Sequence, residues 1–144
     1  MRELTVGDVA RRTGVAVSAL HFYESKGLIS SSRSAGNQRR YRPDVLRRVS
    51  VIRVAQEVGI PLSEVGLALA GLPTDRAPTR ADWAEISERW AKDLDRRISQ
   101  LRKLRTGLVH CIGCGCLSLA ECQLFNRHDR LAAEGAGPRR LLVK

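Results

Sequence analysis

The stretch "TVGDVARRTGVAVSALHFYESKG", residues 5–27, decides the fold of the first half of the chain. It contains two short helical patterns with a turn between them, and Thr5 followed three residues later by Asp8 predicts a capping box at the start of the first helix. Gly14 is a suitable terminator for the first helix, because glycine readily adopts left-handed backbone angles. Ser18 is expected to cap the second helix, and Gly27 to end it. Two short helices joined by a glycine-containing turn predict a helix-turn-helix at about residues 6–26.

An arginine-rich segment follows directly: "SSSRSAGNQRRYRPD", residues 30–44. It is polar and turn-rich, and we expect a hairpin, or wing, at about residues 33–42. From residue 33 to residue 53 there are seven arginines and one acid, Asp44. Such a run is often only a solvated surface, but this one adjoins the helix-turn-helix and encloses Tyr41. We therefore favour phosphate binding, because arginine pairs with phosphate in a bidentate way.

Two further helices are expected before a linker. "DVLRRVSVIRVAQEVG", residues 44–59, has one apolar face, with Asp44 as its expected N-cap and Gly59 at its end. "PLSEVGLALAGL", residues 61–72, is a shorter helix. The chain thus divides into a winged helix-turn-helix domain at 1–72 and a proline-containing linker at 73–80.

A long helix is predicted over residues 81–110, preceded by a capping box formed by Thr79 and Asp82. At 1.5 Å per residue it would be about 45 Å long. A narrow apolar stripe on so long a helix favours a coiled-coil homodimer, and the alternative is packing back on its own domain. The stripe recurs at steps of three or four and consists of Trp83, Ile86, Trp90, Leu94, Ile98, Leu101, Leu104 and Leu108.

Charge and hydropathy restrict the partners. The net charge of +10, from 25 basic and 15 acidic residues, favours double-stranded nucleic acid first and an anionic membrane second. No apolar stretch approaches the roughly 18 residues of a membrane span, and the N-terminus has no apolar signal core. We therefore expect a cytoplasmic protein without a membrane partner, in which thiols stay reduced.

All four cysteines lie in "CIGCGCLSLAEC", residues 111–122. Four thiolates complete either a tetrahedral zinc site or an iron–sulfur cluster. Glycines between the first three cysteines suit tight turns, and the segment from 111 to 124 is expected to be a loop that wraps a metal group. Little chain follows for a zinc staple to hold, so the spacing favours iron–sulfur, and four unliganded cysteines remain a third reading. The tail, 125–144, has little periodicity and is expected to be loosely ordered.

Together these segments resemble the MerR family of transcriptional regulators. The resemblance is carried by "GVAVSALHFYESKGLI" and "GNQRRYRPDVLRRV" in the first half, and by "LDRRISQLRKLR" and "CIGCGCLSLAEC" in the second. The cysteine motif and His21, where the wider family has arginine, are similar to the redox-sensing subgroup. That resemblance implies one [2Fe–2S] cluster per subunit, with the ligands Cys111, Cys114, Cys116 and Cys122.

The resemblance also implies a mechanism. A homodimer would bind a promoter operator and activate transcription by RNA polymerase when the cluster loses one electron. The expected DNA contacts are Ser18, His21 and Tyr23 on the second helix, and Arg39, Arg40 and Tyr41 on the wing. The alternatives are a zinc-binding or other metal-binding regulator of the same family, and a small iron–sulfur electron carrier. No catalytic constellation stands out, so we do not expect an enzyme.

Overall fold

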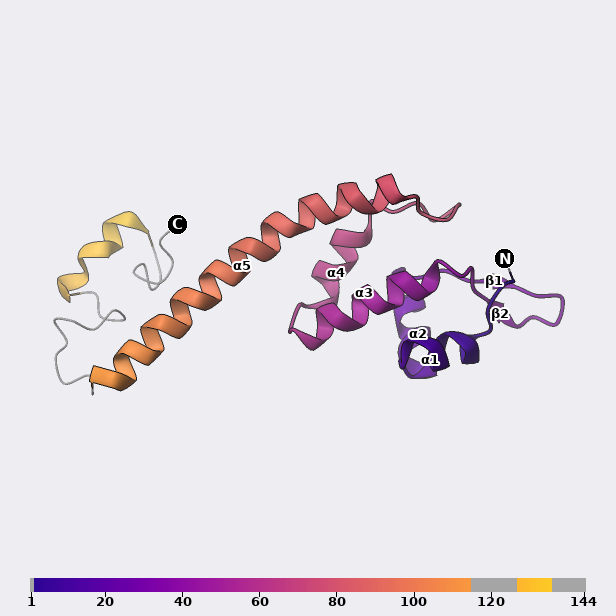
Figure 1. Cartoon of the computed structure of the whole chain (residues 1–144), viewed down its shortest axis with the longest axis horizontal. Helices are drawn as coiled ribbons and strands as arrows, with labels where there is room; N and C mark the ends of the chain where they lie inside the picture. The colour runs from indigo at the N-terminus through magenta and orange to yellow at the C-terminus, as the bar shows by residue number, and fades with distance from the viewer. Residues whose placement is uncertain (1, 115–126, 136–144) are drawn as a thin grey trace. The chain divides into compact units, whose positions relative to one another are not determined.

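The computed structural model describes residues 2–114 and 127–135, and the protein is mostly helical, as predicted. It divides into two compact units, Met1–Trp90 and Ala91–Lys144, and the last long helix begins in the first unit and continues into the second. Figure 1 shows the elements in chain order. They are α1 (Val6–Thr13), α2 (Val17–Ser25), β1 (Ser32–Arg33), β2 (Arg39–Arg40), α3 (Val45–Glu57), α4 (Leu62–Leu69), α5 (Arg80–Cys114) and the 3-10 helix η1 (Arg127–Glu134).

Helix α1 is fixed at both ends by local sequence. The backbone N–H of Asp8 donates to Thr5 Oγ1 at 3.1 Å, and the Thr5 N–H donates back to Asp8 Oδ2 at 3.0 Å. The hydrogen bond from the Thr5 backbone is also the main reason why the pKa of Asp8 lies below its ordinary value. Gly14 ends the helix with φ 69°, and its N–H donates to the Ala10 carbonyl at 2.9 Å. The predicted terminator is confirmed.

Helix α2 begins without a side-chain cap. Ala16, in an extended conformation, occupies the N-cap position, and Ser18 lies inside the first turn. The expectation that Ser18 caps the helix was therefore wrong. The reason is that the apolar face fixes the register of α2: Leu20 is fully buried. At the other end the helix stops at Ser25, and Gly27 follows the C-cap with φ 72°.

The wing is a short antiparallel hairpin in which Ser32 pairs with Arg40 and Arg33 pairs with Arg39. Its turn contains Asn37 in the left-handed region, at φ 59°. An additional bridge joins Leu4 to Tyr41 through two N–H to carbonyl hydrogen bonds of 2.8 Å. The N-terminal segment is therefore tied to the base of the wing. The core of the first unit contains Val9, Leu20, Tyr41, Val49, Ile52 and Val65, each fully buried.

At the start of α3, Asp44 occupies the N-cap position, but its side chain makes no capping hydrogen bond. Its carboxylate instead accepts from Arg42 Nε at 3.0 Å and Nη2 at 3.3 Å. The backbone of Asp44 is already helical, at φ −63° and ψ −19°, rather than extended. The predicted position was correct, and the predicted capping contact was wrong.

The segment expected to be a linker is held against α3 and the residues just before that helix. Arg48 donates to the Pro73 carbonyl at 2.6 Å, and Arg42 donates to the Arg76 carbonyl at 2.8 Å. Beyond the linker, Ile86 of α5 is 4% exposed. The first compact unit consequently extends to Trp90, whereas the sequence suggested a boundary at residue 72.

Helix α5 begins with the predicted capping box, in which the Asp82 N–H donates to Thr79 Oγ1 at 3.2 Å and the Thr79 N–H donates to Asp82 Oδ2 at 2.7 Å. It continues to Cys114, four residues beyond the predicted end at 110, so the expected loop does not begin at Cys111. Residues 115–126 lie outside the described part of the chain. Within the expected tail, η1 is a defined helical segment. None of the helices described is long and apolar enough to cross a membrane.

The contact between α1 and α3 gives a stability prediction. Arg53 of α3 donates to the Thr13 carbonyl at 2.7 Å, and a Cβ at position 14 would collide with the Arg53 guanidinium. Gly14→Ala would also force a left-handed alanine, at about 1–2 kcal/mol. We expect the free energy of unfolding in urea to fall by about 2 kcal/mol.

Gly7→Ala is the matched control, because it lies inside α1 and its Cβ would meet only Thr5 Oγ1 at 3.8 Å. This control should leave stability unchanged or raise it by up to about 1 kcal/mol. Equal unfolding midpoints for the two variants would show that neither the backbone angle nor Arg53 matters at Gly14.

Candidate DNA-binding surface and cysteine region

The outward face of α2 carries two of the predicted contacts. Ser18 and His21 are exposed and lie one helical turn apart, so they share a face. Tyr23 lies on the same helix but faces inward: it is 5% exposed, and its hydroxyl donates to Gln56 Oε1 at 2.5 Å. Burial raises the pKa of Tyr23. Its side chain joins α2 to α3 and is not on the surface where we expected it.

In the wing, Arg39 is engaged by the second helix. Its Nε lies 2.6 Å from Glu24 Oε2, and Glu24 also accepts a hydrogen bond from the Ser31 hydroxyl. Burial alone would raise the pKa of Glu24, but the hydrogen bonds from Ser31 and Arg39 outweigh it, and the pKa is lowered. Arg39 therefore holds the wing against the C-terminal end of α2.

Arg33 and Arg40 are the wing cations whose hydrogen bonds go to uncharged oxygens. Arg33 Nη1 donates to the Asn37 carbonyl at 3.0 Å, and Arg40 Nη2 donates to Gln38 Oε1 at 3.4 Å. Arg33 is exposed and Arg40 is half-buried. These contacts leave both guanidiniums able to meet a phosphate with other N–H groups.

Tyr41 does not lie on the surface. It is fully buried, and its hydroxyl has no hydrogen-bond partner within the described part of the chain. Burial raises its pKa. The bridge to Leu4 holds this residue at the base of the wing, where its ring fills the core. The sequence did not reveal this inward face, because the strand is too short to show an alternating pattern, and a contact between Tyr41 and DNA stays a prediction.

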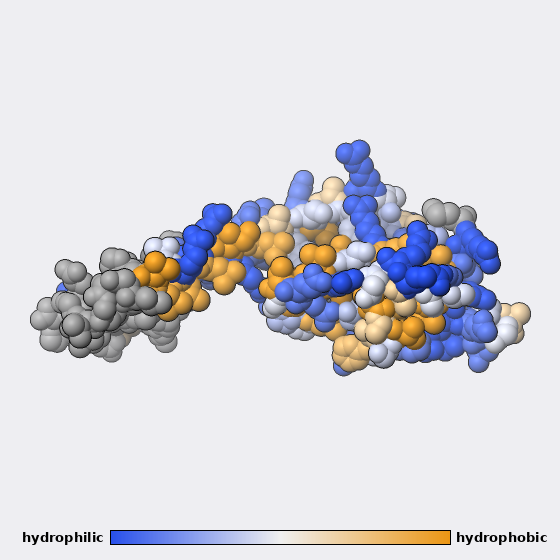
Figure 2. Space-filling model, turned by 60° about the horizontal axis from the view of Figure 1, so that its bottom comes forward, coloured by the Kyte–Doolittle hydropathy of each residue, from blue (hydrophilic) through white to orange (hydrophobic). Residues whose placement is uncertain are grey.

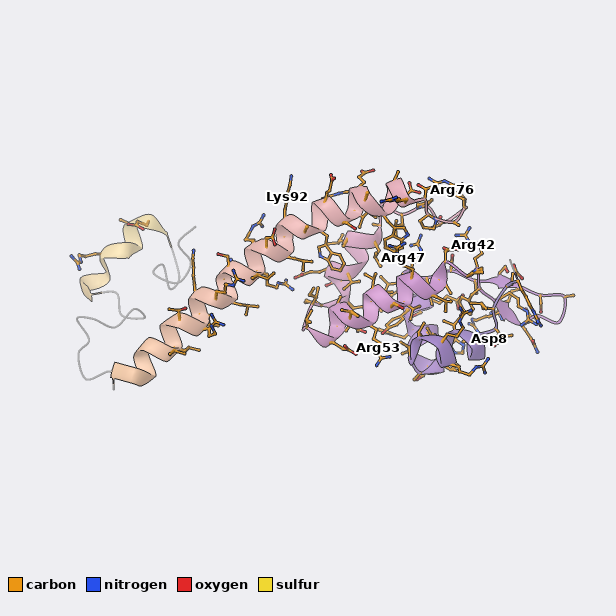
Figure 3. The ribbon with its side chains drawn as sticks, in the orientation of Figure 1. Asp8, Arg42, Arg47, Arg53, Arg76 and Lys92 are labelled. Carbon is orange, nitrogen blue, oxygen red and sulfur yellow. The ribbon has the colours of Figure 1, made fainter. Side chains whose placement is uncertain are left out.

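Most of the arginine run serves the fold. Arg42 pairs with Asp44, Arg53 binds the end of α1, and Arg47 lies 4.8 Å from the centre of the Trp83 ring. Figure 3 labels these three arginines, which extend from α3 or from the segment just before it. Arg48 is 8% exposed. Phosphate binding by the run stays a prediction, and Arg33 and Arg40 are its members best suited to that role.

An apolar stripe is exposed on the second part of α5. The exposed fractions are 45% for Ile98, 57% for Leu101, 43% for Leu104 and 45% for Leu108. Figure 2 shows hydrophobic residues along this helix. Ile86, an earlier member of the predicted stripe, is instead buried within the first unit. An exposed apolar face with this spacing is what a partner helix would bury.

The cysteine segment begins on α5. Positions 111 and 114 lie one turn apart at the end of the helix, so the backbone places them on one side. Cys116 and Cys122 lie outside the described residues. Four cysteine thiolates are the donor set that an iron–sulfur cluster or a zinc ion requires, and the chemistry of the segment fits either group.

The fold and these surfaces define a DNA-binding transcription regulator of the helix-turn-helix class. Residues 4–72 match the sequence profile described as "MerR HTH family regulatory protein", and residues 46–111 match the profile described as "MerR, DNA binding". The chain belongs to the MerR family. Because this family consists of transcription regulators, the expectation that the chain is not an enzyme is confirmed.

The chain is similar to individual members of this family to different degrees. The chain is 55% identical to the "HTH-type transcriptional activator SoxR homolog" of Chromobacterium violaceum, over 96% of this chain and 94% of that one. It is 33% identical to the "HTH-type transcriptional regulator CueR" of Salmonella typhi, over 74% and 77% of the two chains. The fold is also similar to that of HiNmlR, a MerR family regulator lacking the sensor domain, bound to promoter DNA, with a TM-score of 0.50 at 19% identity over 78% and 89% of the chains.

Proposed function

We propose that the chain is a redox-sensing transcription activator of the SoxR type. One observation carries the proposal: all four cysteines fall within residues 111–122 of a chain that is 55% identical, nearly end to end, to a SoxR homolog. The CueR relatives are less similar and align over less of the chain. The proposed ligands of one [2Fe–2S] cluster per subunit are Cys111, Cys114, Cys116 and Cys122.

In the proposed mechanism, two copies pair through the exposed stripe of α5 and present two helix-turn-helix units to a two-fold operator. Ser18 and His21 read the major groove, and Arg33 and Arg40 of the wing bind phosphates. Arg39 acts as a positioning residue through Glu24, because it sets the wing relative to α2.

When bound, the cluster supplies a one-electron redox centre. The cysteine segment would hold that change of charge at the end of α5, beside the proposed dimer seam. Because the seam fixes the spacing of the two DNA-reading units, a shift in the helix ends is expected to change the geometry of the bound promoter. RNA polymerase would then use the promoter when the protein is oxidised. We place this activity in the cytoplasm.

The direct experiment is an anaerobic visible spectrum of the purified protein, with iron and sulfide analysis. The proposal requires iron and inorganic sulfide in equal amounts, and a colour that bleaches under dithionite and returns with an oxidant. A colourless protein containing zinc would instead favour the metal-binding alternative within the same family. A coloured protein without affinity for promoter DNA would favour an electron carrier.

Arg40→Ala tests the wing. If Arg40 binds a phosphate, the variant should bind all DNA sequences more weakly, and the slope of log K against log salt should fall by about one. Operator binding is measured by fluorescence anisotropy at several salt concentrations. Lys92→Ala is the control, since Lys92 is an exposed cation on α5, away from the helix-turn-helix in sequence (Figure 3). An unchanged slope for Arg40→Ala would remove Arg40 from the phosphate-binding set.

A further inference from the structure

A groove within the first unit has no role in the proposed function. It lies between the C-terminal part of α2 and helix α4, and it has a volume of about 670 Å³. This volume lies within the range of small-molecule sites, roughly 300–1,000 Å³. Its apolar walls include Phe22, Leu28, Leu62, Leu67, Leu69 and Leu72.

Part of this apolar surface is unusually open to solvent. Phe22 is 48% exposed and Leu67 is 79% exposed, and they lie on the two helices that border the groove. Gly66 contributes no side chain, and a Cβ at this position would come within 3.1 Å of Leu28 Cδ2. Glycine at position 66 therefore leaves open a space that a larger residue at this position would fill.

The charged residues of the groove are both cations. Lys26 Nζ lies 5.5 Å from the centre of the Phe22 ring. Arg48 is 8% exposed; it donates to the Pro73 carbonyl at 2.6 Å, and its Nε lies 4.0 Å from Asp44 Oδ2. Burial lowers the pKa of Arg48 more than the attraction of Asp44 raises it. No acidic residue is among the lining residues that the structure describes.

We propose that this groove binds a small amphiphilic organic anion. The apolar body of the ligand would lie against the leucines and Phe22, and its carboxylate or sulfonate would lie near Lys26 and Arg48. The negative charge of such a ligand would balance the positive charge of Arg48, because Asp44 is shared with Arg42; a neutral ligand would not do this. A basic occupant is disfavoured by both cations, and the apolar walls do not suit the sugar–phosphate backbone of DNA.

The test uses the purified full chain and the fluorescent anion 1-anilinonaphthalene-8-sulfonate. The probe should brighten on binding, and decanoate should displace it at lower concentration than decanol does. Lys26→Gln should weaken decanoate binding about fivefold, as expected for one partly exposed charge pair, without changing the affinity for decanol. Leu67→Ser should weaken both ligands by about three- to tenfold, because it removes apolar contact area.

Both positions are exposed, so both variants should keep the helical circular dichroism and melting temperature of the parent protein. Lys92→Gln, which removes a cation that does not line the groove, should leave both affinities unchanged. Probe binding that is unaffected by Lys26→Gln and by Leu67→Ser would overturn the proposal, as would equal displacement by decanoate and decanol. The measurement needs neither DNA nor a redox change, so its failure would leave the proposed function untouched.

Discussion

Replacing Leu101 with lysine should convert the proposed dimer into a monomer. Four residues of the α5 stripe are exposed: Ile98, Leu101, Leu104 and Leu108. Leu101 is the most exposed of them, at 57% in the single chain, and it lies near the middle of this exposed part. In a coiled-coil seam the new ammonium group would be buried without a partner, at a cost of about 3–5 kcal/mol. A charge at Leu94, earlier on the same helix, should act in the same direction. Sedimentation of the purified variant measures the effect.

Operator affinity should fall with the dimer, because both half-sites must be held at once. Gln100→Lys is the matched control: it adds the same charge one residue away, at an exposed position off the stripe. This control should remain dimeric and bind the operator normally. An intact dimer with Leu101→Lys, or equal loss in the two variants, would show that the stripe is not the subunit interface.

The features that sequence predicted well are those set by short-range contacts. The capping boxes at Thr5 and Thr79 need only a hydroxyl and a carboxylate three residues apart, and both form. Gly14 ends α1 because glycine alone adopts its backbone angles without strain. The hairpin at 32–40 follows from a polar turn with Asn37 between short strands. These signals lie within a few residues of the structure that they determine.

The features that the sequence did not reveal depend on contacts between residues that are far apart in the chain. Tyr23 and Tyr41 were expected to face DNA, yet Tyr23 reaches Gln56 on another helix and Tyr41 fills the core beside Leu4. An amphipathic residue such as tyrosine suits either place, so its type does not decide. Arg48 is similar, since its partner is the Pro73 carbonyl, 25 residues away.

At the end of α5, the tendency of a glycine to form a turn competes with the tendency of a long helix to continue. Gly113 suggested a turn directly after Cys111, but a glycine inside a helix costs only about 1 kcal/mol. A helix that already extends from Arg80 can continue through it, and α5 does so to Cys114. The first compact unit extends past the expected linker because Ile86 of α5 is buried in it, beside Gly71 in the segment that follows α4.

Serine at any one of the four cysteines should abolish both the visible colour and the oxidant-dependent rise in transcription. The proposed cluster needs four thiolates, and a serine hydroxyl is a poor thiolate substitute. Operator binding should persist, because the helix-turn-helix, the wing and the stripe of α5 are built from other residues. Each variant is assayed by absorbance, by sedimentation for the dimer, by operator binding and by transcription in vitro with and without oxidant. The positions are Cys111, Cys114, Cys116 and Cys122.

The control is Ser118→Ala, a change in the same segment that removes no thiol, and it should keep the colour and the response. A serine variant that has lost its colour but still activates transcription with oxidant would refute the sensor role. A variant that loses operator binding while remaining a folded dimer would mean that the cysteine segment also shapes DNA recognition. Because colour, dimerisation, DNA binding and activation are measured separately, each outcome assigns the four cysteines to one step: holding the cluster, sensing, or positioning the DNA-reading units.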